Sequence, residues 1–221
     1  MSGYADLHCH LLPGVDDGAR SLDDALEMAR ALVDLGFDTV AVSPHARTGM
    51  APVEVCRERL ADLTEALAGA RIPLTLRLGA ENALVEHGFL EGLGTSAARP
   101  VHHGPYVLVE VPYQAPVVAL PALVFQMRRR GVTPLFAHPE RCLEFQRPAR
   151  TRLAAGLYAV AATDLHGPTD AREWVGEALA ELQALAGDTG VVSLLREGPR
   201  RVLAGEPVEM VRGGGVEGGT P

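Results

Sequence analysis

The chain has 221 residues, of which 20 are Lys or Arg and 28 are Asp or Glu, giving a formal net charge of −8 at pH 7. Proteins that bind nucleic acid gather basic side chains to neutralise phosphates, so this charge argues against a nucleic-acid partner. The length fits one domain that buries a core without disulfides, and 47% hydrophobic with 22% charged residues is the composition of an ordinary globular protein.

The cysteines and the start of the chain favour a cytoplasmic protein. Cys9, Cys56 and Cys142 are odd in number and form no CxxC pair, which argues against a disulfide framework. The first residues show no basic segment followed by an apolar one, as a signal peptide would. No apolar stretch approaches the roughly 18 residues that span a bilayer, so we expect no membrane insertion.

Strand and helix patterns alternate along the chain. Short β-branched or apolar runs predict strands at 4–7, 37–43, 74–78, 106–111, 132–137 and 157–163. Helical patterns lie between them, from an N-cap at Ser21 to a stop at Gly36, and over 53–70, 119–130 and 170–186. The alternation predicts an α/β domain with a parallel sheet. We expect one domain over 1–211 and a flexible glycine-rich tail over 212–221.

Histidines and carboxylates follow the predicted strands, where parallel sheets and (β/α) barrels place their functional sites. Because several such residues end successive strands, they indicate a metal site, although one His-x-His pair alone would leave a structural role equally open. A carboxylate inside a buried run also calls for a cation or an arginine partner. The candidates are His8, His10, His45, Glu81, Glu110, His138, Asp164 and His166.

The Asp16-Asp17-Gly18 segment has an ordinary interpretation as a turn in which carboxylates bond to their own backbone. A cysteine-dependent phosphatase is excluded, because it needs Arg six positions after Cys. Those positions hold Val15, Asp62 and Pro148.

Several motifs carry a resemblance to a known family. They are DLHCHLLPGVDDG over 6–18, SPH over 43–45 with Arg47 and Gly49, HPER over 138–141, TDLHG over 163–167 and GPRRVLAG over 198–205. Together they resemble the PHP (polymerase and histidinol phosphatase) superfamily. Within it, they are similar to the bacterial manganese-dependent tyrosine phosphatases of capsular and exopolysaccharide operons, the CpsB and YwqE type. The likeness runs from about residue 4 to residue 208, and its first motif is quite specific.

The resemblance implies a distorted (β/α)7 barrel with three divalent metal ions. Manganese is the family's metal, and iron or zinc would also suit mixed imidazole and carboxylate ligands. The substrate would be phosphotyrosine on the tail of an autophosphorylating bacterial tyrosine kinase that controls polysaccharide export. Arg47 and Arg141 would bind the phosphate. The residues on the family's ligand positions are His8, His10, Asp17, His45, Glu81, Glu110, His138, Asp164 and His166.

The chain departs from the family between His138 and Asp164, where 25 residues leave room for a single strand-helix unit instead of two. We therefore expect a barrel that lacks one strand-helix unit. It either closes with six strands or leaves a gap covered by a neighbouring subunit or by the tail, because an open sheet edge is a liability. An arginine that the family supplies after the last motif has only Arg172 as a rough counterpart.

The leading functional prediction is metal-assisted hydrolysis of a phosphate monoester, in which cations activate water and arginines neutralise the phosphoryl oxygens. Two alternatives stay open. One is a small-molecule phosphatase, for example one acting on histidinol phosphate. The other is an inactive regulatory module that binds metal or a kinase tail without turnover.

Overall fold

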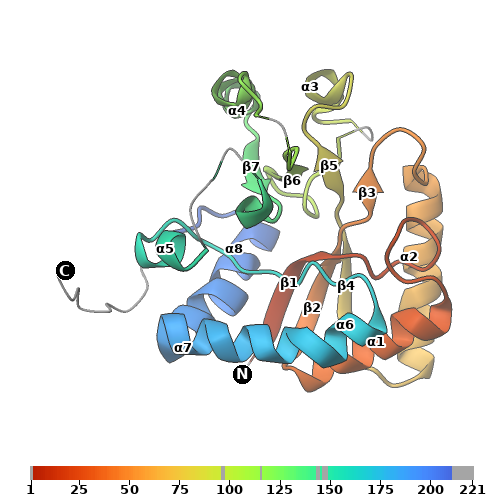
Figure 1. Ribbon diagram of the computed structural model, residues 1–221. Helices are drawn as coiled ribbons and strands as arrows, with labels where there is room; N and C mark the ends of the chain where they lie inside the picture. The colour runs from red at the N-terminus through yellow and green to blue at the C-terminus, as the bar shows by residue number, and fades with distance from the viewer. Residues whose placement is uncertain (1, 96–97, 115, 143–144, 146–148, 211–221) are drawn as a thin grey trace.

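The computed structural model describes residues 2–95, 98–114, 116–142, 145 and 149–210, so the predicted tail over 212–221 lies outside the described residues. The strands form two sheets, of order β1-β2-β4 and β3-β5-β6-β7 (Figure 1). All pairings between these strands are parallel, which confirms the predicted α/β class. The strands are β1 Tyr4–Cys9, β2 Phe37–Val42, β3 His45–Ala46, β4 Thr75–Leu78, β5 Glu81–Ala83, β6 Tyr106–Glu110 and β7 Thr133–Phe136.

The two sheets are joined through the chain, because β2 leads into β3 across Pro44 and β4 leads into β5 across Gly79. Pro44 has no N–H to donate to a ladder. Gly79 passes so close to β2 that a Cβ atom would lie 3.3 Å from a carbonyl oxygen of that strand. Each interrupted strand resumes with a predicted ligand, and His45 and Glu81 pair in register. The break in the strands thus sets these two side chains next to each other.

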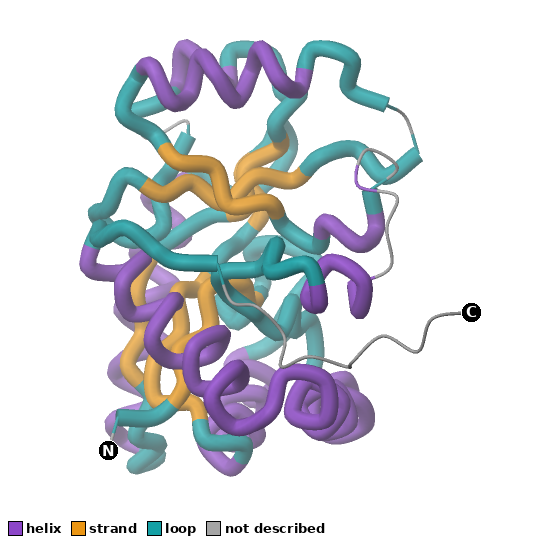
Figure 2. The backbone as a smooth tube through the Cα atoms, turned by 90° about the vertical axis from the view of Figure 1, so that its left-hand side faces the viewer, coloured by secondary structure: helices purple, strands orange, loops and turns teal. Residues whose placement is uncertain are grey.

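Helices cover both sheets (Figure 2). The Ser21 side chain accepts a hydrogen bond from the Asp24 N–H at 3.1 Å, as expected for the cap of α1. One apolar core packs α1 and α2 on the first sheet, and a second packs α3 and α4 on the other. The helices are α1 Leu22–Asp34, α2 Val53–Gly69, α3 Phe89–Gly92, α4 Leu120–Arg129 and α5 Ala149–Ala154, with the 3-10 turn η1 Pro139–Arg141.

The last helical run is longer than the predicted 170–186. Gly187 has φ 67° and ψ 178°, which interrupts the helix where the predicted segment ends, and the chain then becomes helical again. The sequence pattern thus predicted the end of the helix before Gly187 correctly, but it did not predict the helix that follows. The run consists of α6 Pro168–Asp170, the π-helical η3 Ala171–Val175, α7 Gly176–Val192, the π-helical η4 Ser193–Glu197 and α8 Gly198–Ala204.

This run, Pro168–Ala204, is long and apolar enough to cross a membrane by length and composition alone, so the expectation that no such stretch exists is wrong. A helix that packs on the core of a soluble protein passes the same test, and Leu194, Leu195 and Val202 are buried here. The composition of the run is therefore weak evidence for a membrane segment.

The predicted strand over 157–163 does not form among the described residues. Just beyond it, Leu165 makes a parallel bridge to Cys9 of β1. Two residues before Leu165, Thr163 is held by a side chain instead: its Oγ1 donates to Asp6 Oδ2 at 2.5 Å and its N–H to Asp6 Oδ1 at 3.1 Å. A buried carboxylate thus replaces part of a strand ladder next to β1.

The space between β7 and β1 is filled by α8, which lies between these strands in Figure 1. Its Val202 is fully buried in a cluster with Leu7 of β1 and Leu108 of β6. Just beyond the helix, the Glu206 carbonyl accepts a hydrogen bond from the Tyr106 hydroxyl at 2.7 Å. Among the described residues, β7 pairs only with β6, so the six-strand closure that we considered is not formed. Within the described residues, α8 covers this gap.

Candidate metal centre

All nine predicted ligand residues converge at one edge of the sheets. They come from β1 and the loop after it, the starts of β3 and β5, the end of β6, the second residue after β7, and both sides of the Leu165 bridge. They form four overlapping groups, in each of which the potential ligand atoms lie within 4.8 Å of one another. The groups are His10, Asp17, His45 and His166; His8, His10 and Asp164; His8, Glu81 and His138; and His45, Glu81 and Glu110.

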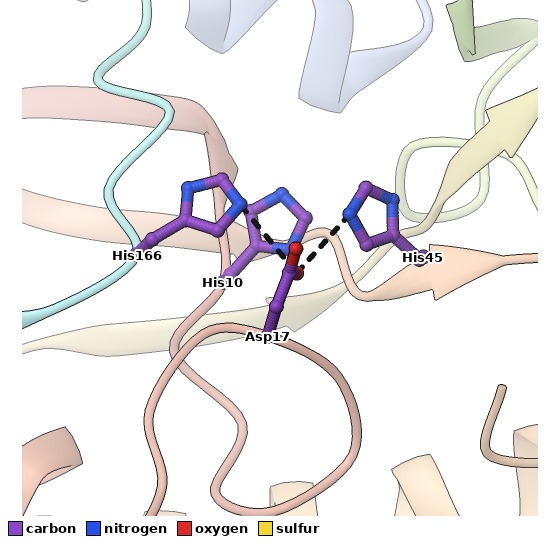
Figure 3. A group of neighbouring side chains, drawn as sticks. All are labelled: His10, Asp17, His45 and His166. Carbon is purple, nitrogen blue, oxygen red and sulfur yellow. Dashed lines mark ion pairs between the residues drawn. The ribbon is translucent and has the colours of Figure 1, made fainter.

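The first group gathers three imidazoles around one exposed carboxylate (Figure 3). Asp17 Oδ1 lies 3.2 Å from His45 Nε2 and 3.7 Å from His166 Nε2. The rings of His10 and His166 are stacked, with centroids 4.0 Å apart. Asp17 therefore extends from its loop over the histidines, although its sequence context equally suggested a simple turn.

Glu81 is at the centre of the cluster, and its side chain is only 1% exposed. Its Oε2 lies 2.9 Å from His45 Nδ1 and 3.4 Å from both His8 Nε2 and His10 Nε2. Its Oε1 lies 2.8 Å from His138 Nε2. One carboxylate thus faces four imidazoles with two oxygens, an arrangement that lets it bridge two cations.

Asp164 faces the same histidines from the other side. Its Oδ1 lies 3.2 Å from His8 Nε2 and 3.8 Å from His10 Nε2. These two imidazole nitrogens are themselves 3.2 Å apart. Because a neutral imidazole presents one lone pair, two such nitrogens at this distance need a proton or a shared cation between them.

The donor set fits divalent metal ions. Glu81 Oε2 and Asp164 Oδ1 are buried carboxylate oxygens that have no hydrogen-bond partner, although imidazole nitrogens surround them. Unpaired buried oxygens of this kind are costly unless a cation satisfies them. Mixed imidazole and carboxylate ligands are those that Mn, Fe and Zn accept.

The cluster perturbs the pKa values of its members. Burial alone would raise the pKa of Glu81, but the adjacent imidazoles of His10, His138, His45 and His8 hold it far below its usual range. Burial lowers the pKa of His10, yet its hydrogen bonds to Asp16 and Glu81 outweigh this and raise the pKa to about 10. Without cations, His10 therefore holds a proton that a metal ion must displace.

The pH dependence of metal affinity follows from this competition. A metal binds neutral His10, and its pKa of about 10 means that a proton must leave at pH 7. The apparent affinity for Mn²⁺ should thus rise with pH between 6 and 9, by about tenfold per unit for each displaced proton. Calorimetric titration in buffers of different ionisation enthalpy counts the released protons. An affinity independent of pH would contradict the prediction.

Asp16 supports the site and is missing from the predicted ligands. Its buried Oδ2 accepts a hydrogen bond from His10 Nδ1 at 2.8 Å and one from the His45 N–H at 3.1 Å. This contact fixes the His10 ring so that Nε2 points to the cluster, as carboxylates behind metal-bound histidines do. Sequence reasoning assigned Asp16 to a turn, and its Oδ1 does accept from the Gly18 N–H at 3.0 Å. Its position next to the candidate ligand Asp17 was the one sequence feature that could have indicated a role for Asp16 in the site.

Asp16→Asn should weaken metal binding by about 10- to 100-fold, because an amide supports the His10 ring less well than a carboxylate. Mn²⁺ titration followed by calorimetry measures the effect. Asp23→Asn is a matched control, since Asp23 lies exposed in the first turn of α1. An affinity within twofold of the unmodified chain would contradict the positioning role.

The two predicted phosphate-binding arginines lie at the rim. Arg47 Nη1 is 3.5 Å from Glu110 Oε2, and Arg141 Nη1 is 3.3 Å from Asp164 Oδ2. The Arg141 guanidinium also stacks 4.6 Å from the centre of the Tyr113 ring, which steadies it. Both side chains are partly exposed, so their remaining donors can reach an anion above the cluster.

Arg172, the rough counterpart of the family's arginine after the last motif, forms an ion pair with Glu27 of α1. His87, His102 and His103 are outside the four ligand groups of the described residues.

Comparisons with known proteins agree with this geometry. A family profile described as "Capsular polysaccharide synthesis, CpsB/CapC" matches residues 4–152. The tyrosine-protein phosphatase YwqE of Bacillus subtilis is 33% identical over 144 residues, 64% of this chain and 56% of the relative. The putative tyrosine-protein phosphatase CapC of Staphylococcus aureus is 25% identical over 138 residues, covering 62% and 54%. The chain thus spans about half the length of these relatives.

A solved structure is also similar. It belongs to a study of YwqE from Bacillus subtilis and CpsB from Streptococcus pneumoniae, described as unique metal-dependent tyrosine phosphatases. The TM-score is 0.81 at 25% identity, and the match covers 96% of this chain and 99% of that one.

Proposed function

The chain belongs to the CpsB/CapC family of capsular polysaccharide synthesis, and from this we propose that it is a metal-dependent protein-tyrosine phosphatase. The observation that carries the proposal is the set of four overlapping ligand groups around Glu81, with Arg47 and Arg141 at their rim. Relatives described as tyrosine phosphatases support the same activity.

We further propose that the fold is a distorted (β/α)7-type barrel that lacks one strand-helix unit between His138 and Asp164. The short connection and the packing of α8 between β1 and β7 support this proposal. The same domain extends over 1–211, with the glycine-rich tail over 212–221 outside it.

Three divalent cations, Mn²⁺ in the first place and otherwise Fe or Zn, would be held by the nine residues of the cluster. When bound, such ions supply Lewis acidity toward the phosphoryl group and lower the pKa of water. The chain's own contribution is to hold imidazoles and carboxylates in place, with Asp16 behind His10 and Tyr113 in contact with His138 at 3.2 Å.

The arginines would orient the substrate. Guanidinium groups form paired, charge-assisted hydrogen bonds to phosphoryl oxygens, and these strengthen as the oxygens gain charge in the transition state. Arg47 and Arg141 approach the cluster from different elements, so they can hold a phosphate between them. No general acid is assigned, because a tyrosyl oxygen is a fairly good leaving group.

The Arg141→Ala variant should lose about 10- to 100-fold in kcat/KM toward a phosphotyrosine peptide, since one charge-assisted contact to the phosphoryl group disappears. Metal content should stay the same, because Arg141 is not a ligand. Steady-state kinetics together with elemental analysis check both statements. Arg30→Ala is the control, because it removes an exposed charge from α1. Arg152 is not used for this purpose, because it is buried.

The substrate is proposed to be the phosphotyrosine tail of a bacterial tyrosine kinase of capsule or exopolysaccharide synthesis, in the cytoplasm. The family's link to capsular polysaccharide synthesis supports this partner. Association into an oligomer would be compatible with the proposal.

The experiment that tests the function compares hydrolysis of a phosphotyrosine peptide with hydrolysis of histidinol phosphate, by manganese-loaded protein before and after chelation. We expect a clear preference for the peptide and loss of turnover on chelation. Preference for histidinol phosphate would favour the small-molecule phosphatase. Peptide binding without phosphate release would favour the inactive regulatory module.

A further inference from the structure

A second cavity, of about 400 Å³, lies on the outer side of β4 and shares no residue with the four ligand groups. β4 is an edge strand of the first sheet. Its free side meets a loop instead of another strand, and the His102 N–H donates to the Leu78 carbonyl at 3.1 Å. Together with α2, which packs on β4 (Figure 1), this loop encloses the cavity.

The cavity is lined by five basic side chains, Arg57 from α2, Arg77 from β4, and Arg99, His102 and His103 from the loop. No Asp or Glu is among its lining residues. Within the described part of the chain, none of the five has a carboxylate within ion-pair distance. Such a cluster is unexpected in a chain of net charge −8, where most arginines could find an acidic partner.

Arg99 is the most informative of the five. The residue is only 7% exposed, and its buried Nη1 has no hydrogen-bond partner among the described residues. Its backbone is held on both sides by Asn82, which accepts from the Arg99 N–H at 3.0 Å and donates to the Arg99 carbonyl at 2.9 Å. A buried guanidinium nitrogen without a partner is costly unless an acceptor, such as an anion, satisfies it.

The field in the cavity is positive. Burial lowers the pKa of His102, and the charges of His103 and Arg77 lower it further. The rings of His102 and His103 lie 4.1 Å apart. A bound anion would have the opposite effect and favour the protonated form of His102.

We propose that this cavity binds a small phosphorylated anion at a site separate from the metal centre. Planar guanidinium groups match phosphoryl oxygens in paired hydrogen bonds. The volume is within the range of small-molecule sites, about 300–1,000 Å³. Arg99 also borders a smaller cavity next to Arg47, so the test must distinguish the two places.

The test is a titration of the full chain with inorganic phosphate at constant ionic strength, in which NMR follows the His102 and His103 imidazole signals. Both signals should shift and saturate. In Arg57→Ala/Arg77→Ala, the midpoint should move to at least about tenfold higher phosphate, because two charge-assisted contacts are lost. Both replaced side chains are exposed, so the fold should persist.

Two further variants serve as controls. Arg30→Ala/Arg59→Ala removes the same charge from exposed positions outside the cavity and should keep the midpoint within twofold. Arg47→Ala should also leave the His102 and His103 midpoint unchanged. The proposal is overturned by signals that never saturate, by an unchanged midpoint in Arg57→Ala/Arg77→Ala, or by an equal shift in Arg47→Ala. Methyl phosphate, titrated in parallel, distinguishes phosphate esters from free phosphate as the better ligand.

Discussion

The Glu81→Gln variant is expected to lose at least about 1,000-fold in kcat/KM toward a phosphotyrosine peptide, and most of its bound metal. Glu81 belongs to two of the ligand groups and faces four imidazoles with its two oxygens. An amide has the same shape but carries no charge, so it cannot bridge two cations. The lost Lewis-acid stabilisation amounts to several kcal/mol, which sets the size of the effect.

Steady-state kinetics and elemental analysis of the purified variant measure this outcome. Glu65→Gln is the matched control, because Glu65 is exposed on α2, and it should keep full activity and metal content. Cys9→Ser should retain much of the activity, since no cysteine acts as nucleophile in the proposed reaction. If Glu81→Gln kept more than a tenth of the turnover, the metal-dependent mechanism would be wrong.

Removal of metal is expected to lower the melting temperature by roughly 10 °C and to abolish turnover. A ligand at 1,000 times its Kd stabilises the folded state by about 4 kcal/mol. For a chain of this length, each kcal/mol shifts the melting temperature by about 2–4 °C. Without cations, Glu81 Oε2 and Asp164 Oδ1 have no hydrogen-bond partner in the interior. Removal of metal should therefore destabilise the buried centre of the fold.

Differential scanning calorimetry of the chain before and after chelation checks this expectation, with Mn²⁺ added back to show reversal. Glu81→Gln provides the internal comparison, since Mn²⁺ should raise its melting temperature much less. An equal rise in both proteins would place the stabilising ions outside the cluster.

Much of the sheet was predictable because buried parallel strands leave a local signature. β2 and β6 begin where the apolar runs at 37 and 106 begin, and the candidate ligands His45 and Glu110 lie just after the first run and within the second. The Ser21 cap of α1 was predictable for the same reason, because it depends on residues next to it in the sequence. Such features depend on neighbours in sequence, which a single chain displays directly.

The remaining features depend on distant residues. The expected strand over 157–163 competes with hydrogen bonds between Thr163 and Asp6, residues that only the fold brings together. Asp16 reads locally as a turn residue, and only the structure shows its second oxygen behind His10. Helix continuation after Gly187 likewise depends on packing of Leu194 and Val202 against the core, which outweighs the local break.

The insertion of α8 between β1 and β7 has a consequence for biosynthesis. Residues near the two ends of the chain meet there, and the Arg200 guanidinium donates to the Gly3 carbonyl at 3.1 Å and to the Asp38 carboxylate at 2.5 Å. A nascent polypeptide can assemble α1 and the strands near it while translation proceeds. The gap between β1 and β7 is covered only when α8 has left the ribosome, so this part of the fold is completed after all the strands of both sheets have been made.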